Sequence, residues 1–117
     1  MTGRLEYLGS RWLLAILFAA GAVQKAVDPA AAQALLNGLN LPSWLIWPAL
    51  VFNAVAALCL VTDVRVRGVA LALCLYCLLT SVFHFVPDDP WQMSIMVKNW
   101  AIAGGCLALA ALAAREV

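Results

Sequence analysis

Four long apolar stretches constrain this sequence more than any other feature. They cover about residues 12–27, 44–61, 68–86 and 91–114. A helix needs roughly 20 residues to cross a hydrocarbon core about 30 Å thick, and each stretch is close to that length. Helix-breaking turns separate the stretches, among them Asp28-Pro29 and the PDDP run at 87–90. The stretches therefore predict four membrane-spanning helices.

Composition supports lipid as the main surroundings of the chain. Hydrophobic residues make up 66% of the 117 residues and charged residues only 11%, against about 25% charged in a typical soluble domain. A membrane barrel is not favoured, because its strands would alternate apolar and polar residues. We predict an all-α, four-transmembrane-helix bundle that forms a single domain over residues 1–117. A short helix at residues 30–38, lying at the membrane interface, is predicted after the first span.

The basic residues predict the orientation of the bundle. Its arginines fall on one side: Arg4, Arg11, Arg65, Arg67 and Arg115. Lys25 and Lys98 fall on the other side, offset by Asp28, Asp88 and Asp89. The positive-inside rule places the arginine side, and with it both termini, in the cytoplasm.

Small residues predict where the helices meet. They recur at helical spacing at Ala15, Ala19 and Ala22, and again at Ala101, Gly104, Gly105 and Ala108. Such stripes let helix backbones approach closely in lipid; the alternative is that they only reflect how common alanine is in this chain.

Polar side chains inside the predicted spans are few and gather toward the outer side. The binding-pocket candidates are Gln24, Lys25, Asp28, Asn53, His84, Gln92, Lys98 and Asn99. Polar groups in a membrane are costly and often functional, so we expect these residues to converge on one outer-leaflet pocket. No catalytic residue can be assigned among them.

Lys98 and His84 stand out among these candidates. Lys98 lies about two turns into the last span, where it either binds an anion, carbonyl or carboxylate (Asp28, Asp88 or Asp89) or snorkels to the interface. His84 either relays a proton or hydrogen-bonds at the interface. Lys25 and Asp28 either pair at the end of the first span or serve as a simple interfacial anchor, which the small value of surface ion pairs favours.

Cys74 and Cys77 form a CxxC motif, the spacing of many thiol oxidoreductases. The pair lies near the middle of the third span, where apolar surroundings disfavour the reactive thiolate. We therefore expect packing rather than redox chemistry there. Neither a metal nor a haem site is predicted, because His84 has no second ligand at suitable spacing. The net charge of +1 predicts no nucleic-acid partner.

Several short motifs, in this order and spacing, resemble the DoxX family of small membrane proteins. They are Ala20-Gly21, Gln24-Lys25, Asp28, Leu41-Pro42, Thr62 through Arg67, Phe83-His84-Phe85, Gln92 and the KNWAIAGG run at 98–105. The family commonly carries a glutamate in its second helix, and Asn53 is the equivalent here. The resemblance implies a bacterial inner-membrane protein related to a membrane subunit of a thiosulfate:quinone oxidoreductase.

The leading hypothesis is a DoxX-like subunit of an oxidoreductase system that contacts quinone at the outer pocket, through Lys98 and His84. Whether such a subunit is itself an enzyme or an accessory stays open. One alternative is a non-enzymatic anchor or assembly factor for a soluble extracytoplasmic or membrane partner. The other is a small-anion transporter, which would have to work as a homo-oligomer because four helices enclose little pathway.

Overall fold

Helices make up nearly all of the computed structural model, which describes residues 3–116. In chain order they are α1 (Arg4–Val27), α2 (Pro29–Gly38), the 3-10 helix η1 (Ser43–Leu45), α3 (Ile46–Thr62), α4 (Val66–Thr80), the 3-10 helix η2 (Ser81–His84) and α5 (Pro90–Glu116). No strand occurs within this described range, which confirms the all-α prediction. The short helix predicted after the first span is present as α2. The first helix begins at Arg4 rather than at Trp12, because the polar residues of its first turns contact other parts of the protein.

Within residues 3–116, four helical segments are long and apolar enough to cross a membrane. They are Arg4–Val27, Ser43–Thr62, Val66–His84 and Pro90–Arg115, in which η1 and η2 extend α3 and α4. The molecule measures 46 Å along its longest axis, close to the 40–45 Å of a bilayer with its headgroup regions. Large apolar side chains such as Leu13 and Trp91 are exposed on the bundle surface, as expected where lipid is the solvent.

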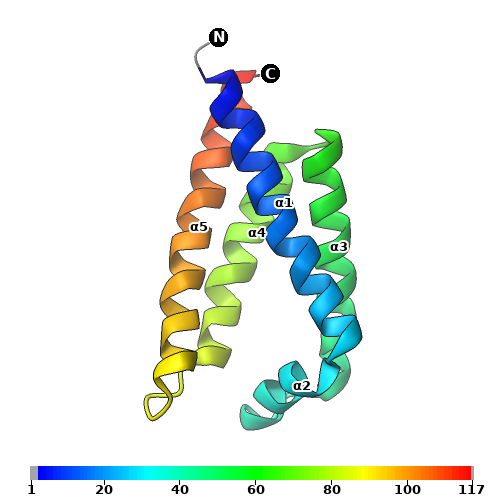
Figure 1. Ribbon diagram of the computed structural model, residues 1–117, viewed down its shortest axis with the longest axis vertical. Helices are drawn as coiled ribbons and strands as arrows, with labels where there is room; N and C mark the ends of the chain where they lie inside the picture. The colour runs from blue at the N-terminus through cyan, green and yellow to red at the C-terminus, as the bar shows by residue number, and fades with distance from the viewer. Residues whose placement is uncertain (1–2, 117) are drawn as a thin grey trace.

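The two chain ends lie together at one end of the bundle, beside the turn between α3 and α4 (Figure 1). We name this the inner end and the opposite end, which carries α2, the outer end, following the orientation predicted from the arginines. The bundle consists of two closely packed helix pairs, α1 with α3 and α4 with α5. Contacts between α3 and α4 are much sparser.

Small side chains form much of the buried core between the helices. Ala15 of α1, Ala56 of α3, Ala70 of α4 and Ala110 of α5 are all at most 3% exposed. Without a hydrophobic force between helices in lipid, close backbone approach through small residues is the main route to van der Waals packing. The core therefore consists of close contacts between helices, and larger side chains such as Leu73 fill the space that remains between them.

The predicted contact stripes are only partly used. On α1, Ala15 and Ala22 are buried, whereas Ala19 is exposed. On α5 the stripe of Ala101, Gly104, Gly105 and Ala108 is exposed, and a Cβ added at Gly104 or Gly105 would meet nothing within 4 Å. The predicted contact face of α5 is therefore wrong. The face of α5 that packs against the other helices of the chain carries Ala103, Cys106, Leu109, Ala110 and Ala113. Small residues recur on several faces of this alanine-rich helix, so spacing alone did not identify the buried one.

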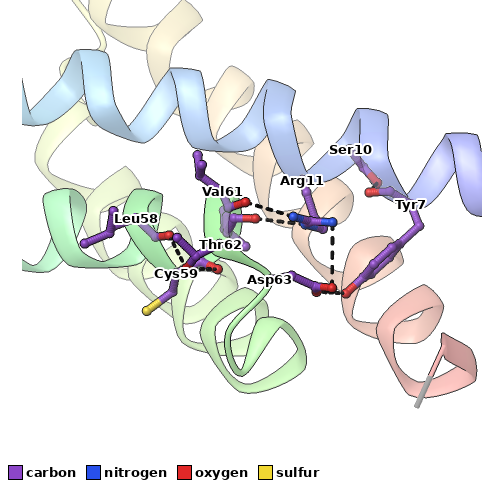
Figure 2. A network of polar contacts seen from close by, with 9 residues as sticks. Tyr7, Ser10, Arg11, Leu58, Cys59, Val61, Thr62 and Asp63 are labelled. Carbon is purple, nitrogen blue, oxygen red and sulfur yellow. Dashed lines mark hydrogen bonds and ion pairs between the residues drawn. The ribbon is translucent and has the colours of Figure 1, made fainter.

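Arg11 joins α1 to the end of α3 (Figure 2). Its Nε donates to the carbonyl oxygen of Leu60 at 2.8 Å, and its Nη2 donates to that of Val61 at 2.9 Å. Both carbonyls belong to the last turn of α3, whose final carbonyl groups have no partner within the helix. The cation also lies at the negative end of the helix dipole. Arg11 therefore caps α3 from a neighbouring helix.

Asp63 and Tyr7 complete this inner polar network. Asp63 follows α3 in the left-handed conformation, at φ 61°. Its carboxylate accepts a hydrogen bond from the Tyr7 hydroxyl at 2.6 Å and lies 3.9 Å from Arg11 Nη1. The guanidinium also stands over the Tyr7 ring, 5.3 Å from its centroid. The network thus holds the turn after α3 against the first three turns of α1.

Replacing Arg11 by Gln should destabilise the protein by roughly 1.5–3 kcal/mol, the range for hydrogen bonds made by a charged group. The shorter neutral side chain cannot reach both α3 carbonyls and Asp63. Arg4→Gln, which removes the same charge from an exposed position of α1, is the matched control. Unfolding of both variants in detergent, followed by circular dichroism, checks the difference. Equal destabilisation by the two changes would show that the hydrogen bonds from Arg11 to α3 add no stability beyond the effect of its positive charge.

Candidate functional site

A buried polar cluster lies between α1 and α3 in the outer half of the bundle. Asn53 of α3 is 2% exposed, and its amide nitrogen faces Gly21 of α1. A Cβ added at Gly21 would lie 3.3 Å from Asn53 Nδ2 and 3.8 Å from Lys25 Nζ. Tyr76 of α4 interacts with the Asn53 side chain. We name Gly21, Lys25, Asn53 and Tyr76 the Asn53 cluster.

Helix geometry explains how the cluster assembles. Gly21 and Lys25 are four residues apart on α1 and so share one face. Gly21 has no side chain, which leaves room beside α1 for the Asn53 amide and the lysine ammonium. Tyr76 approaches from the neighbouring helix pair, and its ring lies 5.1 Å from that of Phe52, the residue before Asn53. The cluster therefore draws on three of the four spans.

Asn53 Oδ1 is buried without a hydrogen-bond partner. A buried polar atom left unpaired costs about 1–3 kcal/mol, and lipid surroundings give it no solvent in which to find a partner. Such an atom calls for an explanation beyond packing. It makes Asn53 the strongest candidate for a ligand-contacting residue in this protein.

Lys25 places a cation beside Gly21, where the Asn53 amide nitrogen also lies. Its side chain is half-buried. Lys25 does not form an ion pair with Asp28. The ion pair found among residues 3–116 joins Arg11 to Asp63 instead. Asp28 is exposed and ends α1, with its backbone N–H donating to Gln24, which is also exposed. Lys25 thus keeps its donors available within the described part of the chain.

His84 and Gln92 form a second, separate polar contact where η2 meets α5. His84 Nδ1 lies 2.7 Å from Gln92 Oε1, so this ring nitrogen carries the proton and donates. The helix η2 ends at His84 and does not continue to Asp88, so these two residues do not share a helical face. Asp89 caps α5 instead, accepting hydrogen bonds from the backbone of Trp91 and Gln92 at 3.0 and 3.4 Å.

Lys98 is exposed on α5 and lies over Trp91, with its Nζ 5.5 Å from the ring centroid. This is the snorkelling arrangement of a long cationic side chain at a membrane interface. No carboxylate in the described range pairs with it. Asn99 beside it is half-buried. The polar candidates therefore do not form one pocket: Lys25 and Asn53 come together, His84 and Gln92 come together, and Lys98 faces outward.

The cysteines lie in the packed core. Cys74 and Cys77 of α4 are buried, as is Cys106 of α5, and all are free thiols. Thiol–disulfide exchange needs an accessible thiolate, which this position does not provide. Their placement suits small hydrophobic side chains. Among residues 3–116, no three His, Cys, Asp or Glu residues lie together as a metal site would need.

Comparison with known proteins assigns the family. The model of the DoxX family matches residues 7–86, which is more than half of the chain. The chain belongs to the DoxX family. No curated protein and no solved structure matches it.

The part of this DoxX protein that matches the family runs from Tyr7 to Val86. It contains Arg11, Asp63 and the whole Asn53 cluster. The KNWAIAGG run at 98–105, which carries much of the resemblance, lies outside it. Sequence reasoning treated Arg11 only as a topology signal and missed Tyr76. The polarity of Lys25 and Asn53 within the spans predicted two members of the cluster, and the four-residue spacing of Gly21 and Lys25 was the signal for Gly21.

Replacing Asn53 by Leu should stabilise the protein, by about 1 kcal/mol, because a γ-branched apolar side chain removes the unpaired polar atom. A residue retained for ligand contact at a cost in stability behaves in this way. Thermal unfolding in detergent checks the result. Asn99→Leu, the same substitution at a half-buried position of α5, is the control. A clear loss of stability for Asn53→Leu alone would identify Asn53 as a structural residue instead.

Proposed function

We propose that this DoxX protein is the membrane subunit of a quinone-linked oxidoreductase system and binds a quinone head group at the Asn53 cluster. The observation that carries the proposal is the buried, unpaired Asn53 Oδ1, on a side chain whose amide nitrogen lies beside Gly21 together with the Lys25 ammonium. The cluster lies toward the outer end, the side from which an extracytoplasmic electron donor would approach.

The donors and acceptors of the cluster fit both forms of such a ligand. A quinone carbonyl accepts hydrogen bonds, and Lys25 Nζ and Asn53 Nδ2 are donors. A quinol hydroxyl donates, and Asn53 Oδ1 is an acceptor without a partner. When bound, a quinone supplies an acceptor for two electrons and two protons, which come from the donor system and the solvent.

The chain's own residues would bind and orient the ligand rather than carry electrons. Gly21 lets the Asn53 amide approach α1 closely, and Lys25 stabilises negative charge that develops on a ligand oxygen. Asn53 cannot titrate, unlike the glutamate common at this position in the family. It therefore distinguishes the ligand's redox forms by hydrogen bonding alone, which suits an accessory subunit.

The test is binding of a short-chain quinone analogue to the full-length protein in nanodiscs, followed by tryptophan fluorescence. Lys25→Met should weaken binding by about tenfold or more, because a hydrogen bond from a charged donor is worth about 1.5–3 kcal/mol. Asn53→Leu should also weaken it. Lys98→Met removes a lysine at the outer end that lies outside the cluster and should leave binding unchanged.

Two results would contradict the proposal. One is the absence of any saturable binding to the unmodified protein. The other is loss of binding in Lys98→Met together with full binding in Lys25→Met, which would move the site to the surface of α5.

A further inference from the structure

An apolar groove runs along the outside of the bundle between α3 and α4. A cavity of about 230 Å³ forms its inner part, lined by Ala56 and Cys59 of α3 and by Gly68 and Val69 of α4. Toward the outer end it meets a shallow apolar surface of α3 that runs from Trp47 to Val55. Phe52 and Val55 line both parts, so the two form one track.

Sparse packing between the two helix pairs keeps this groove open. The close contacts of α3 are with α1 and those of α4 are with α5, so the seam between α3 and α4 is poorly filled. Gly68 lies at the inner mouth, where an added Cβ would meet nothing within 4 Å. The groove is therefore a gap that the chain does not fill with its own side chains.

Arg65 is the charged residue that lines the groove, and it stands at the inner end. It is exposed and makes no hydrogen bond or ion pair with any residue in the described range. Its neighbour Arg67, by contrast, donates to the carbonyl oxygen of Ala110 at 3.0 Å. The Arg65 backbone is left-handed, at φ 50°, which is uncommon for a long side chain.

The part of the groove from Phe52 to the inner end has the length of one leaflet. From Phe52 to Thr62, where α3 ends, the axis rises about 15 Å at 1.5 Å per residue, and half of a 30 Å hydrocarbon core is about 15 Å. The cation stands at the inner end, where a lipid headgroup would lie. A long apolar track with one free cation at the headgroup level matches an acyl chain joined to an anionic phosphate.

We propose that the α3–α4 groove is a binding site for an anionic phospholipid of the inner leaflet. Arg65 contacts the phosphate, and an acyl chain lies against Phe52, Val55 and Gly68. The amino-terminal end of α4 adds a favourable field for the anion. This site is separate from the Asn53 cluster and does not depend on quinone binding.

Native mass spectrometry of the detergent-solubilised protein tests the proposal, with phosphatidylglycerol and phosphatidylcholine titrated separately. The unmodified protein should bind phosphatidylglycerol more tightly than phosphatidylcholine. Arg65→Gln should weaken phosphatidylglycerol binding about fivefold, the effect of one cation at an anionic membrane surface. Arg4→Gln removes the same charge at the inner end, away from the groove, and should have little effect.

A second pair of variants tests the acyl-chain part of the site. Gly68→Leu fills the inner mouth and should lower phosphatidylglycerol binding, whereas Gly104→Leu, at an equally open glycine of α5, should not. Glycerol 3-phosphate should fail to displace the bound lipid, because it lacks the chains. Equal losses for Arg65→Gln and Arg4→Gln, no effect of Gly68→Leu, or displacement by glycerol 3-phosphate would each overturn the proposal.

Discussion

The hydrogen bonds from Arg11 to the last carbonyls of α3 set the arrangement on which much of this structure depends. At the edge of a membrane the final carbonyls of a helix have little water to bind and must find partners in the protein. Arg11 supplies them from α1 and brings Asp63 and Tyr7 into the same network. This fixes the register between two antiparallel helices, because a guanidinium fork offers only a few ways to meet two successive carbonyls.

The Asn53 cluster follows from that register. Moving outward from Arg11 along α1, and from Leu60 back along α3, the two helices bring Gly21 opposite Asn53. Glycine allows a polar amide to lie where an ordinary side chain would exclude it. The inner and outer halves of the α1–α3 pair thus contrast: the inner polar groups are paired and stabilise the fold, whereas the outer ones keep unpaired hydrogen-bonding capacity.

The division into two helix pairs explains the remaining surface features. Close packing within each pair uses the small residues of the core, including Cys74 and Cys77, which form a redox-like CxxC motif in the sequence. The seam between α3 and α4 is left open for a lipid in our proposal. Arg65 stands at the end of this seam where the charged headgroup of the lipid would lie. In lipid such a gap is tolerable, since an acyl chain replaces the missing side chains without loss of hydrophobic contact.

The sequence by itself determined the four spans, the short helix after the first, the grouping of arginines at one end and the family. These follow from hydrophobic length, from prolines and from charge, which act locally along the chain. Only the tertiary structure decided which polar residues meet. Lys98 stands out over Lys25 in the sequence, yet Lys98 lies over a surface tryptophan and Lys25 near a buried amide. That difference depends on the rotation and register of each helix, which contacts between distant segments set.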